Sequence, residues 1–127
     1  MKRILIIDDE VQILMMLKKM LERSGYEVDL AANGHEGLRL LQETGADLVI
    51  TDIIMPEKEG LETIREMQAL EPGLKMIAIS GGGKVNAESY LQMARGFGAQ
   101  KVLSKPFTKK EVLDAVDSLL VSGEEDS

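Results

Sequence analysis

The chain of 127 residues contains no cysteine and a single histidine, His35. The lack of cysteine excludes disulfide frameworks, thiolate catalysis and zinc or iron–sulfur sites that cysteine would hold. With one histidine, neither a catalytic histidine pair nor a multi-histidine metal site can be built within one chain. A metal bound by this chain is therefore expected to have oxygen ligands.

The chain also has few positive charges. It contains 15 Lys and Arg residues against 22 Asp and Glu residues, which gives a net charge of −7. Duplex binding relies on clustered Lys and Arg, so this balance argues against direct nucleic-acid contact. No apolar run approaches the roughly 20 residues that a bilayer span needs. The N-terminus leads into a predicted strand rather than a signal peptide. We therefore expect a cytoplasmic protein without a membrane segment.

Short apolar runs alternate with amphipathic stretches along the whole chain. The runs predict five strands, at residues 4–7, 26–31, 47–51, 75–79 and 101–103. A helical pattern follows each of them. This alternation predicts an α/β fold, with a doubly wound parallel sheet and helices on both faces. We expect one domain over residues 1–121 and an acidic flexible tail over residues 122–127.

Local signals refine the expected helices. Asn33 is a predicted N-cap, and Thr108 with Glu111 matches the capping box of the last helix. Three methionines in the first helix are interpreted as gap-filling core residues, namely Met15, Met16 and Met20. The helix expected after Asn86 has a narrow apolar stripe, formed by Tyr90, Leu91, Ala94 and Phe97. This narrow stripe predicts a marginal helix that can move. The three glycines before it, at 81–83, are interpreted as a mobile loop.

The apolar run at residues 48–51 ends abruptly at Asp52, four residues before Pro56. A run without polar alternation is typical of a strand buried on both faces. In open α/β sheets, ligands and chemistry collect at the carboxyl ends of such strands. Asp52 is therefore a candidate acceptor of a phosphoryl group, although an aspartate at this point could equally cap the next helix.

Polar residues follow four of the five predicted strands, and a doubly wound sheet brings those strand ends to one edge. The set consists of Asp8, Asp9, Asp52, Ser80 and Lys105. Three crowded carboxylates repel one another unless a cation neutralises them, and oxygen ligands favour magnesium. A carboxylate can act as the nucleophile in phosphoryl transfer, while an ammonium and a hydroxyl contact phosphate oxygens. Each residue alone has a structural explanation, but five at one edge favour a site.

Over about residues 3–121 the sequence resembles the receiver domain of bacterial two-component response regulators. The matching motifs are the Asp8-Asp9 pair, the segment Asp-Ile-Ile-Met-Pro at 52–56 with Gly60 after it, Ser80, and Lys-Pro-Phe at 105–107. The resemblance implies a flavodoxin-like (βα)5 fold with the strand order 2-1-3-4-5. It also implies a phosphoprotein in which Asp52 is the phosphoacceptor.

The resemblance assigns further roles at this edge. It implies a magnesium ion held by Asp9, Asp52 and the backbone carbonyl of Ile54, with Asp8 acting through water. Lys105 then pairs with the phosphoryl group, and the peptide bond between Lys105 and Pro106 is cis.

The switch itself departs from the family pattern. In the family, the residue at Ser80 moves towards the phosphate and an aromatic residue on the last strand changes rotamer with it. Val102 stands at that aromatic position here, so the loop at 81–83 and the following helix are expected to carry the change instead. Ile54 and Gly82 occupy positions that tune the lifetime of the phosphoryl group. Neither can orient an attacking water, so slow self-dephosphorylation is expected.

The function implied is a phosphorylation switch, charged by a sensor histidine kinase and read in trans by a downstream protein. The reading face would be the helix after Asn86, the strand at 101–103 and the last helix, and a homodimer could use the same face. Two alternatives stay open: a phosphorelay intermediate that passes the group to a histidine phosphotransfer domain, and a receiver fragment of a larger regulator.

A turnover enzyme on the same scaffold is a weaker hypothesis. Aspartyl-phosphate phosphatases on a similar scaffold carry a D-x-D pattern, whereas Asp8 and Asp9 are adjacent. A flavin site is disfavoured because the acidic loop after the first strand would repel a phosphate. We therefore expect self-catalysed, magnesium-dependent phosphoryl uptake and no turnover enzyme.

Overall fold

A parallel sheet of five strands lies at the centre of the computed structural model, which describes residues 2–52, 60–80, 92, 95–96 and 98–125. The strands are β1 (Arg3–Ile7), β2 (Glu27–Ala31), β3 (Leu48–Asp52), β4 (Lys75–Ser80) and β5 (Lys101–Ser104). The helices are α1 (Val11–Arg23), α2 (Gly34–Thr44), α3 (Gly60–Leu70) and α5 (Lys109–Glu125). The strand order is β2-β1-β3-β4-β5, with parallel pairing throughout. The predicted flavodoxin-like fold and its strand order are confirmed.

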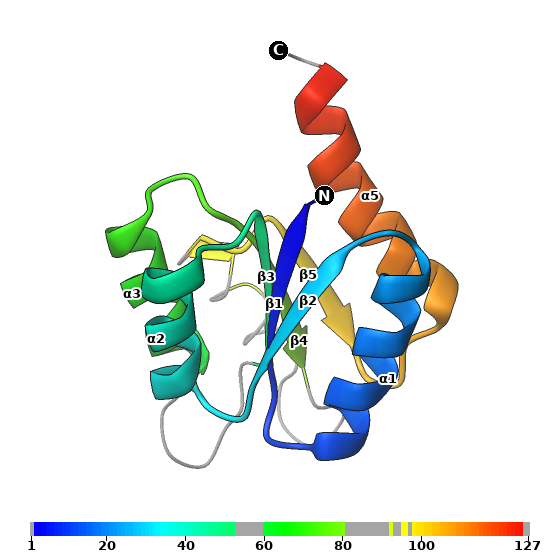
Figure 1. Cartoon of the computed structure of the whole chain (residues 1–127). Helices are drawn as coiled ribbons and strands as arrows, with labels where there is room; N and C mark the ends of the chain where they lie inside the picture. Colours follow the sequence, from blue (N-terminus) through cyan, green and yellow to red (C-terminus); the bar gives the residue numbers. More distant parts are fainter. Residues whose placement is uncertain (1, 53–59, 81–91, 93–94, 97, 126–127) are drawn as a thin grey trace.

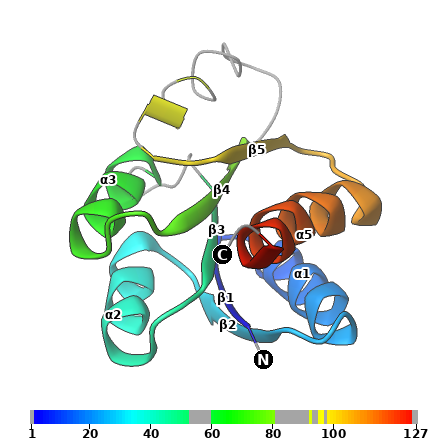
Figure 2. The ribbon, with the colours of Figure 1, turned by 90° about the horizontal axis from the view of Figure 1, so that it is seen from above.

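Helices cover both faces of the sheet (Figures 1 and 2): α1 and α5 pack on one face, α2 and α3 on the other. Successive residues of β1 point to opposite faces, as in any strand. Ile4 and Ile6 therefore join the core beneath α1 and α5, whereas Leu5 and Ile7 join the core beneath α2 and α3. Both faces are buried, which explains why the central strands read as unbroken apolar runs.

The helix starts follow the predicted local chemistry. Asn33 Oδ1 accepts a hydrogen bond of 2.9 Å from the Glu36 backbone N–H at the start of α2. At the start of α5, Thr108 Oγ1 accepts from the Glu111 N–H at 3.1 Å, and Glu111 Oε1 accepts from the Thr108 N–H at 2.8 Å. This reciprocal pair is a capping box, as the sequence predicts.

The interpretation of the α1 methionines as core residues is wrong for two of the three. Met15 is 54% exposed and Met16 is 42% exposed, while Met20 packs against the core as a partly buried residue. Leu14 and Leu17 already form the buried stripe of this helix. At about 100° per residue, the two positions after Leu14 turn away from the sheet.

Helix α5 extends further than expected, because it continues to Glu125 and so includes most of the segment predicted as a flexible tail. Once a helix is nucleated, each added residue gains one backbone hydrogen bond while only that residue loses conformational freedom. The helical part of the domain therefore ends later than the sequence pattern indicates.

The helix predicted after Asn86 falls largely outside the described residues, as do the glycines at 81–83. Gln92, Arg95 and Gly96 are described, and each is helical. No helix within the described part of the chain is both long and apolar enough to cross a bilayer.

Candidate functional site

The strand register places two acids side by side at the carboxyl edge of the sheet. Ile7 at the end of β1 pairs with Thr51 in β3, so Asp8 and Asp52 each come one residue after that pair. On the other side, Ser80 at the end of β4 pairs with Ser104, and Lys105 follows directly. The predicted convergence of strand ends at one edge is therefore what the fold produces.

Asp8 and Asp52 are almost completely buried, with side chains 1% and 5% exposed. Oδ1 of Asp8 accepts a hydrogen bond of 2.8 Å from the backbone N–H of Glu10. Carboxylate oxygens of Asp8 and Asp52 lie within 4.8 Å of each other. Two negative charges at that distance in a water-poor site are unfavourable unless a cation offsets them.

Lys105 supplies a positive charge at this point. Its Nζ lies 3.2 Å from Oδ2 of Asp52, 3.2 Å from Oδ2 of Asp8 and 2.7 Å from Oε1 of Glu10. The lysine follows β5, which is two strand spacings, or roughly 10 Å, from β3, and its long side chain covers part of that gap. The Lys105 side chain is 14% exposed, so water screens these ionic contacts only partly.

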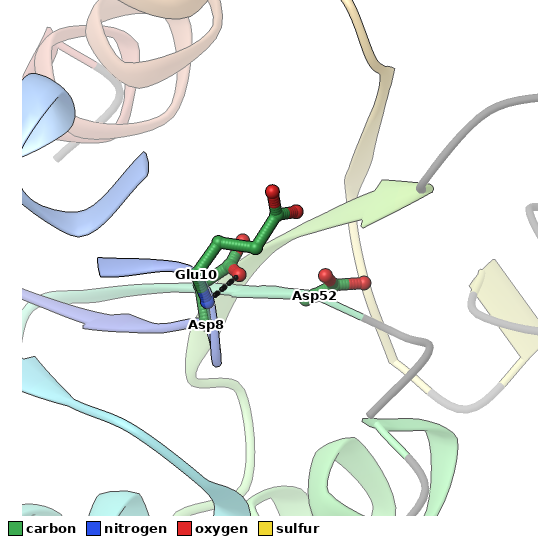
Figure 3. A group of neighbouring side chains, drawn as sticks. All are labelled: Asp8, Glu10 and Asp52. Carbon is green, nitrogen blue, oxygen red and sulfur yellow. Dashed lines mark hydrogen bonds between the residues drawn. The ribbon is translucent and has the colours of Figure 1, made fainter. Parts of the chain in front are cut away.

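Glu10 belongs to this group, although the sequence reasoning did not single it out (Figure 3). Single carboxylate oxygens of Asp8, Glu10 and Asp52 all lie within 4.8 Å of one another. Glu10 is the N-cap residue of α1, but its side chain makes no capping hydrogen bond. Its position as the third acid in the run that begins at Asp8 was the available signal.

The arrangement fits a divalent cation. Oδ2 of Asp8 is buried and accepts no hydrogen bond from any described residue, and the Lys105 ammonium lies 3.2 Å from it. Magnesium prefers hard oxygen ligands and commonly uses one or two carboxylates. Asp8 and Asp52 are the buried acids available for that role here.

The other predicted site residues are placed less completely. Asp9 is exposed and does not belong to the three-carboxylate group formed by the described residues. Ser80 is the last residue of β4. Val102 is partly buried against the core beneath α2 and α3. Ile54 and Gly82 lie outside the described residues. Their predicted roles stay predictions.

The peptide bond between Lys105 and Pro106 is cis, as the resemblance implies. Lys105 begins the connection between β5 and α5.

Charge and burial shift two pKa values at the site. Burial raises the pKa of Asp8 from 3.8 to about 6; the Glu10 backbone N–H and Lys105 oppose this shift, and the Asp52 charge adds to it. For Lys105, burial alone lowers the pKa, but the hydrogen bond to Glu10 and the charges of Asp52 and Asp8 outweigh it. The pKa of Lys105 therefore lies above its usual value, and the ammonium stays charged at neutral pH.

The chain is similar to known proteins over nearly its whole length. A model of the response regulator receiver domain matches residues 4–117. The response regulator receiver protein CpdR of Brucella abortus is 35% identical over 122 residues, covering 96% of this chain and 99% of CpdR. The chemotaxis protein CheY of Thermotoga maritima is 35% identical over 119 residues, covering 93% of this chain and 97% of CheY.

Among solved structures, the response regulator protein TrrA from Thermotoga maritima, in complex with Mg2+-BeF, is similar with a TM-score of 0.81. It is 35% identical, and the match covers 94% of this chain and 100% of TrrA.

Proposed function

The chain belongs to the receiver-domain family of response regulators, and from this premise we propose that it is a phosphoacceptor switch charged on Asp52 by a sensor histidine kinase. The observation that carries the proposal is the position of the Lys105 ammonium, 3.2 Å from Oδ2 of the buried Asp52. A carboxylate at the carboxyl end of a central strand, with a fixed cation beside it, is equipped to receive a phosphoryl group.

In the proposed reaction, a carboxylate oxygen of Asp52 attacks the phosphorus of a phosphohistidine on the kinase. The new P–O bond forms as the P–N bond breaks, and the histidine ring, which carries a proton on its other nitrogen, leaves as neutral imidazole with the electron pair of that bond. Phosphoryl transfer asks the protein mainly for positioning and charge neutralisation. Lys105 supplies a charge that can follow the developing negative charge on the phosphoryl oxygens.

Asp9, Asp52 and the Ile54 carbonyl are the proposed magnesium ligands, with Asp8 acting through a bound water. The buried Oδ2 of Asp8, which accepts no hydrogen bond from a described residue, supports this assignment. When bound, the ion would neutralise phosphoryl oxygens and the acids around them.

The proposed donor surface is the outer side of α1. Among the described residues the exposed large hydrophobic side chains are Val11, Met15, Met16 and Leu70, and three of these four belong to α1. This helix begins directly after Glu10, beside the site. A kinase that delivers its phosphohistidine to Asp52 must cover the neighbouring rim, and exposed methionines are well suited to adaptable contacts.

The proposed output surface is β5 and α5 together with the helix predicted after Asn86, and a downstream protein or a second copy of the chain would bind there. β5 is an edge strand of the sheet, and its terminal residues Lys101 and Ser104 are exposed. Sedimentation of the protein with and without beryllofluoride would test the homodimer: a rise in mass with the phosphoryl mimic supports it, and an unchanged monomer argues for another protein as the reader.

The phosphoacceptor role is tested with acetyl phosphate and magnesium, using intact mass to detect a phosphoryl group. Wild-type protein should gain one phosphoryl mass, and Asp52→Ala should gain none. Asp114→Ala, which removes an exposed acid of α5, is the matched control and should behave as wild type. A phosphoryl mass on Asp52→Ala would place the acceptor elsewhere.

A further inference from the structure

Among the described residues, the shortest contact of the Lys105 ammonium is with Glu10 and not with the proposed phosphoacceptor. Nζ lies 2.7 Å from Oε1 of Glu10, against 3.2 Å from the nearest oxygens of both Asp8 and Asp52. The Glu10 side chain is 59% exposed, whereas the two aspartates are buried. The ammonium is therefore held by one acid at the rim of the site and two acids inside it.

Glu10 has no capping role that would explain this orientation. It is the N-cap residue of α1, yet its side chain accepts no capping hydrogen bond. Its backbone carbonyl accepts from the N–H groups of Ile13 and Leu14 at 3.1 Å, and its own N–H donates to Asp8. The backbone of Glu10 thus anchors the helix start, while the carboxylate turns to the site (Figure 3).

We propose that Glu10 is a positioning residue that holds the Lys105 ammonium in the unphosphorylated protein and opposes its transfer to an incoming phosphoryl group. This inference rests on the proposed function of Asp52. A phosphoryl group on Asp52 would offer Lys105 new anionic oxygens, and the contact with Glu10 must then weaken or break. Glu10 would in this way set how readily the site accepts the group.

Two physical effects act in the same direction. The ion pair with Lys105 stabilises the unphosphorylated state, because that contact exists only there. The negative charge of Glu10 also repels an incoming anion, since like charges within a few ångströms are unfavourable in a partly buried site. Removing the charge therefore favours anion uptake. A partly exposed ion pair of this kind corresponds to an effect of about two- to fivefold in affinity.

Affinity for beryllofluoride, measured by calorimetry at saturating magnesium, tests this inference. Glu10→Gln should bind beryllofluoride about two- to fivefold more tightly than wild type. Glu10→Asp keeps the charge but shortens the side chain by one methylene, so it should release Lys105 in part and show an intermediate gain. Glu22→Gln removes one charge from the same helix, where Glu22 pairs with Lys18, and should match wild type.

Magnesium affinity without beryllofluoride provides a second readout. Glu10→Gln should change it less than twofold, whereas Asp8→Asn should weaken it strongly. If Glu10→Gln weakens magnesium binding as much as Asp8→Asn does, Glu10 is a metal ligand and the inference is overturned. Unchanged or weaker beryllofluoride binding by Glu10→Gln overturns it too, and so does a Glu10→Asp variant that equals wild type.

The two levels of the proposal fail differently. If wild-type protein and Asp52→Asn bind beryllofluoride equally poorly, the phosphoacceptor role itself fails and this inference falls with it. If wild type binds and Asp52→Asn does not, the phosphoacceptor role stands, and the Glu10 variants alone decide whether that residue restrains Lys105.

Discussion

Lys105 donates a hydrogen bond of 3.2 Å from Nζ to Oδ2 of Asp52, although 53 residues separate the two along the chain. The contact is made at the carboxyl edge of the sheet, and it joins the connection after β5 to the end of β3. Both the stability of the metal-free protein and its proposed chemistry depend on this cation.

Replacing Lys105 with methionine should destabilise the metal-free protein by about 3 kcal/mol, because it leaves Asp8 and Asp52 buried without their cation. Magnesium should restore part of that loss, since a ligand that binds only the folded state stabilises it. Urea unfolding at neutral pH, with chelator or with magnesium, measures both effects. Lys110→Met is the control, because Lys110 is 83% exposed and its ion pair with Asp114 contributes little.

The raised pKa of Asp8 makes stability depend on pH. The pKa of Asp8 is 3.8 in the unfolded chain and about 6 in the folded protein. Between these two pH values, Asp8 is protonated in the folded protein but ionised in the unfolded chain. The contribution of Asp8 is thus fully present below about pH 4 and is lost as the pH rises through 6, with a size on the order of 2 to 3 kcal/mol. In chelator, the unfolding free energy of wild type relative to Asp8→Asn should fall across this range. A constant difference would contradict the shift.

Gly37→Ala should destabilise the domain by about 1 to 3 kcal/mol through overpacking. A Cβ at this position of α2 would collide with Cδ1 of Ile7, lie 2.9 Å from its Cγ1 and lie 3.4 Å from Cε of Met67. Ile7 directly precedes Asp8, so phosphoryl uptake should slow as well. Denaturant unfolding and the acetyl phosphate assay measure the two effects. Gly96→Ala is the control, because a Cβ at this position would meet no atom within 4 Å. This variant should be neutral or slightly stabilising.

Charged substitutions on the outer side of α1 should separate kinase docking from chemistry. Met15→Glu and Met16→Glu should slow phosphoryl transfer from the kinase about fivefold or more, because interface anchors carry much of the binding energy. Uptake from acetyl phosphate should not change, since the site is untouched. Leu70→Glu alters a side chain of α3 that is 49% exposed and is the control. Equal slowing with both donors would exclude a docking role.

The phosphoryl group on Asp52 should persist for minutes rather than seconds. Ile54 and Gly82 stand at the two lifetime-tuning positions that the family resemblance assigns, and neither can orient an attacking water. Intact mass followed over time, in magnesium and after acetyl phosphate is removed, gives the half-life. Ile54→Gln introduces an amide at one position and should shorten it. A half-life of seconds in wild type would refute the prediction.

The fold was largely predictable because its signals are local. An unbroken apolar run indicates a strand buried on both faces, and the capping residues Asn33 and Thr108 make the hydrogen bonds that their positions suggest. Val28 and Leu30 alternate with Glu27 and Asp29, which is the pattern expected of an edge strand, and β2 lies at an edge of the sheet. Strand ends shifted by a single residue, as at Asp52, which the structure places inside β3.

The sequence indicated the strand-end acids and the lysine as candidate site residues, but it did not indicate the contacts between them. The Glu10 contact joins residues 95 apart and depends on how two long side chains orient in the folded state. No local spacing signals such a contact. The exposure of Met15 was missed for a related reason: residue type suggested a core position, whereas the neighbouring leucines already filled that face of α1.

Within the described part of the chain, the open sheet leaves two strands, β2 and β5, with an unpaired side. On β2, Glu27 and Asp29 form ion pairs with Arg3, so this edge of the sheet carries charged side chains. The strand at the other edge, β5, is only four residues long. Charged or short borders resist the addition of a foreign strand. Self-association of this protein should therefore proceed through side chains of β5 and of the helices beside it, and a continuous sheet running from one molecule into the next is disfavoured.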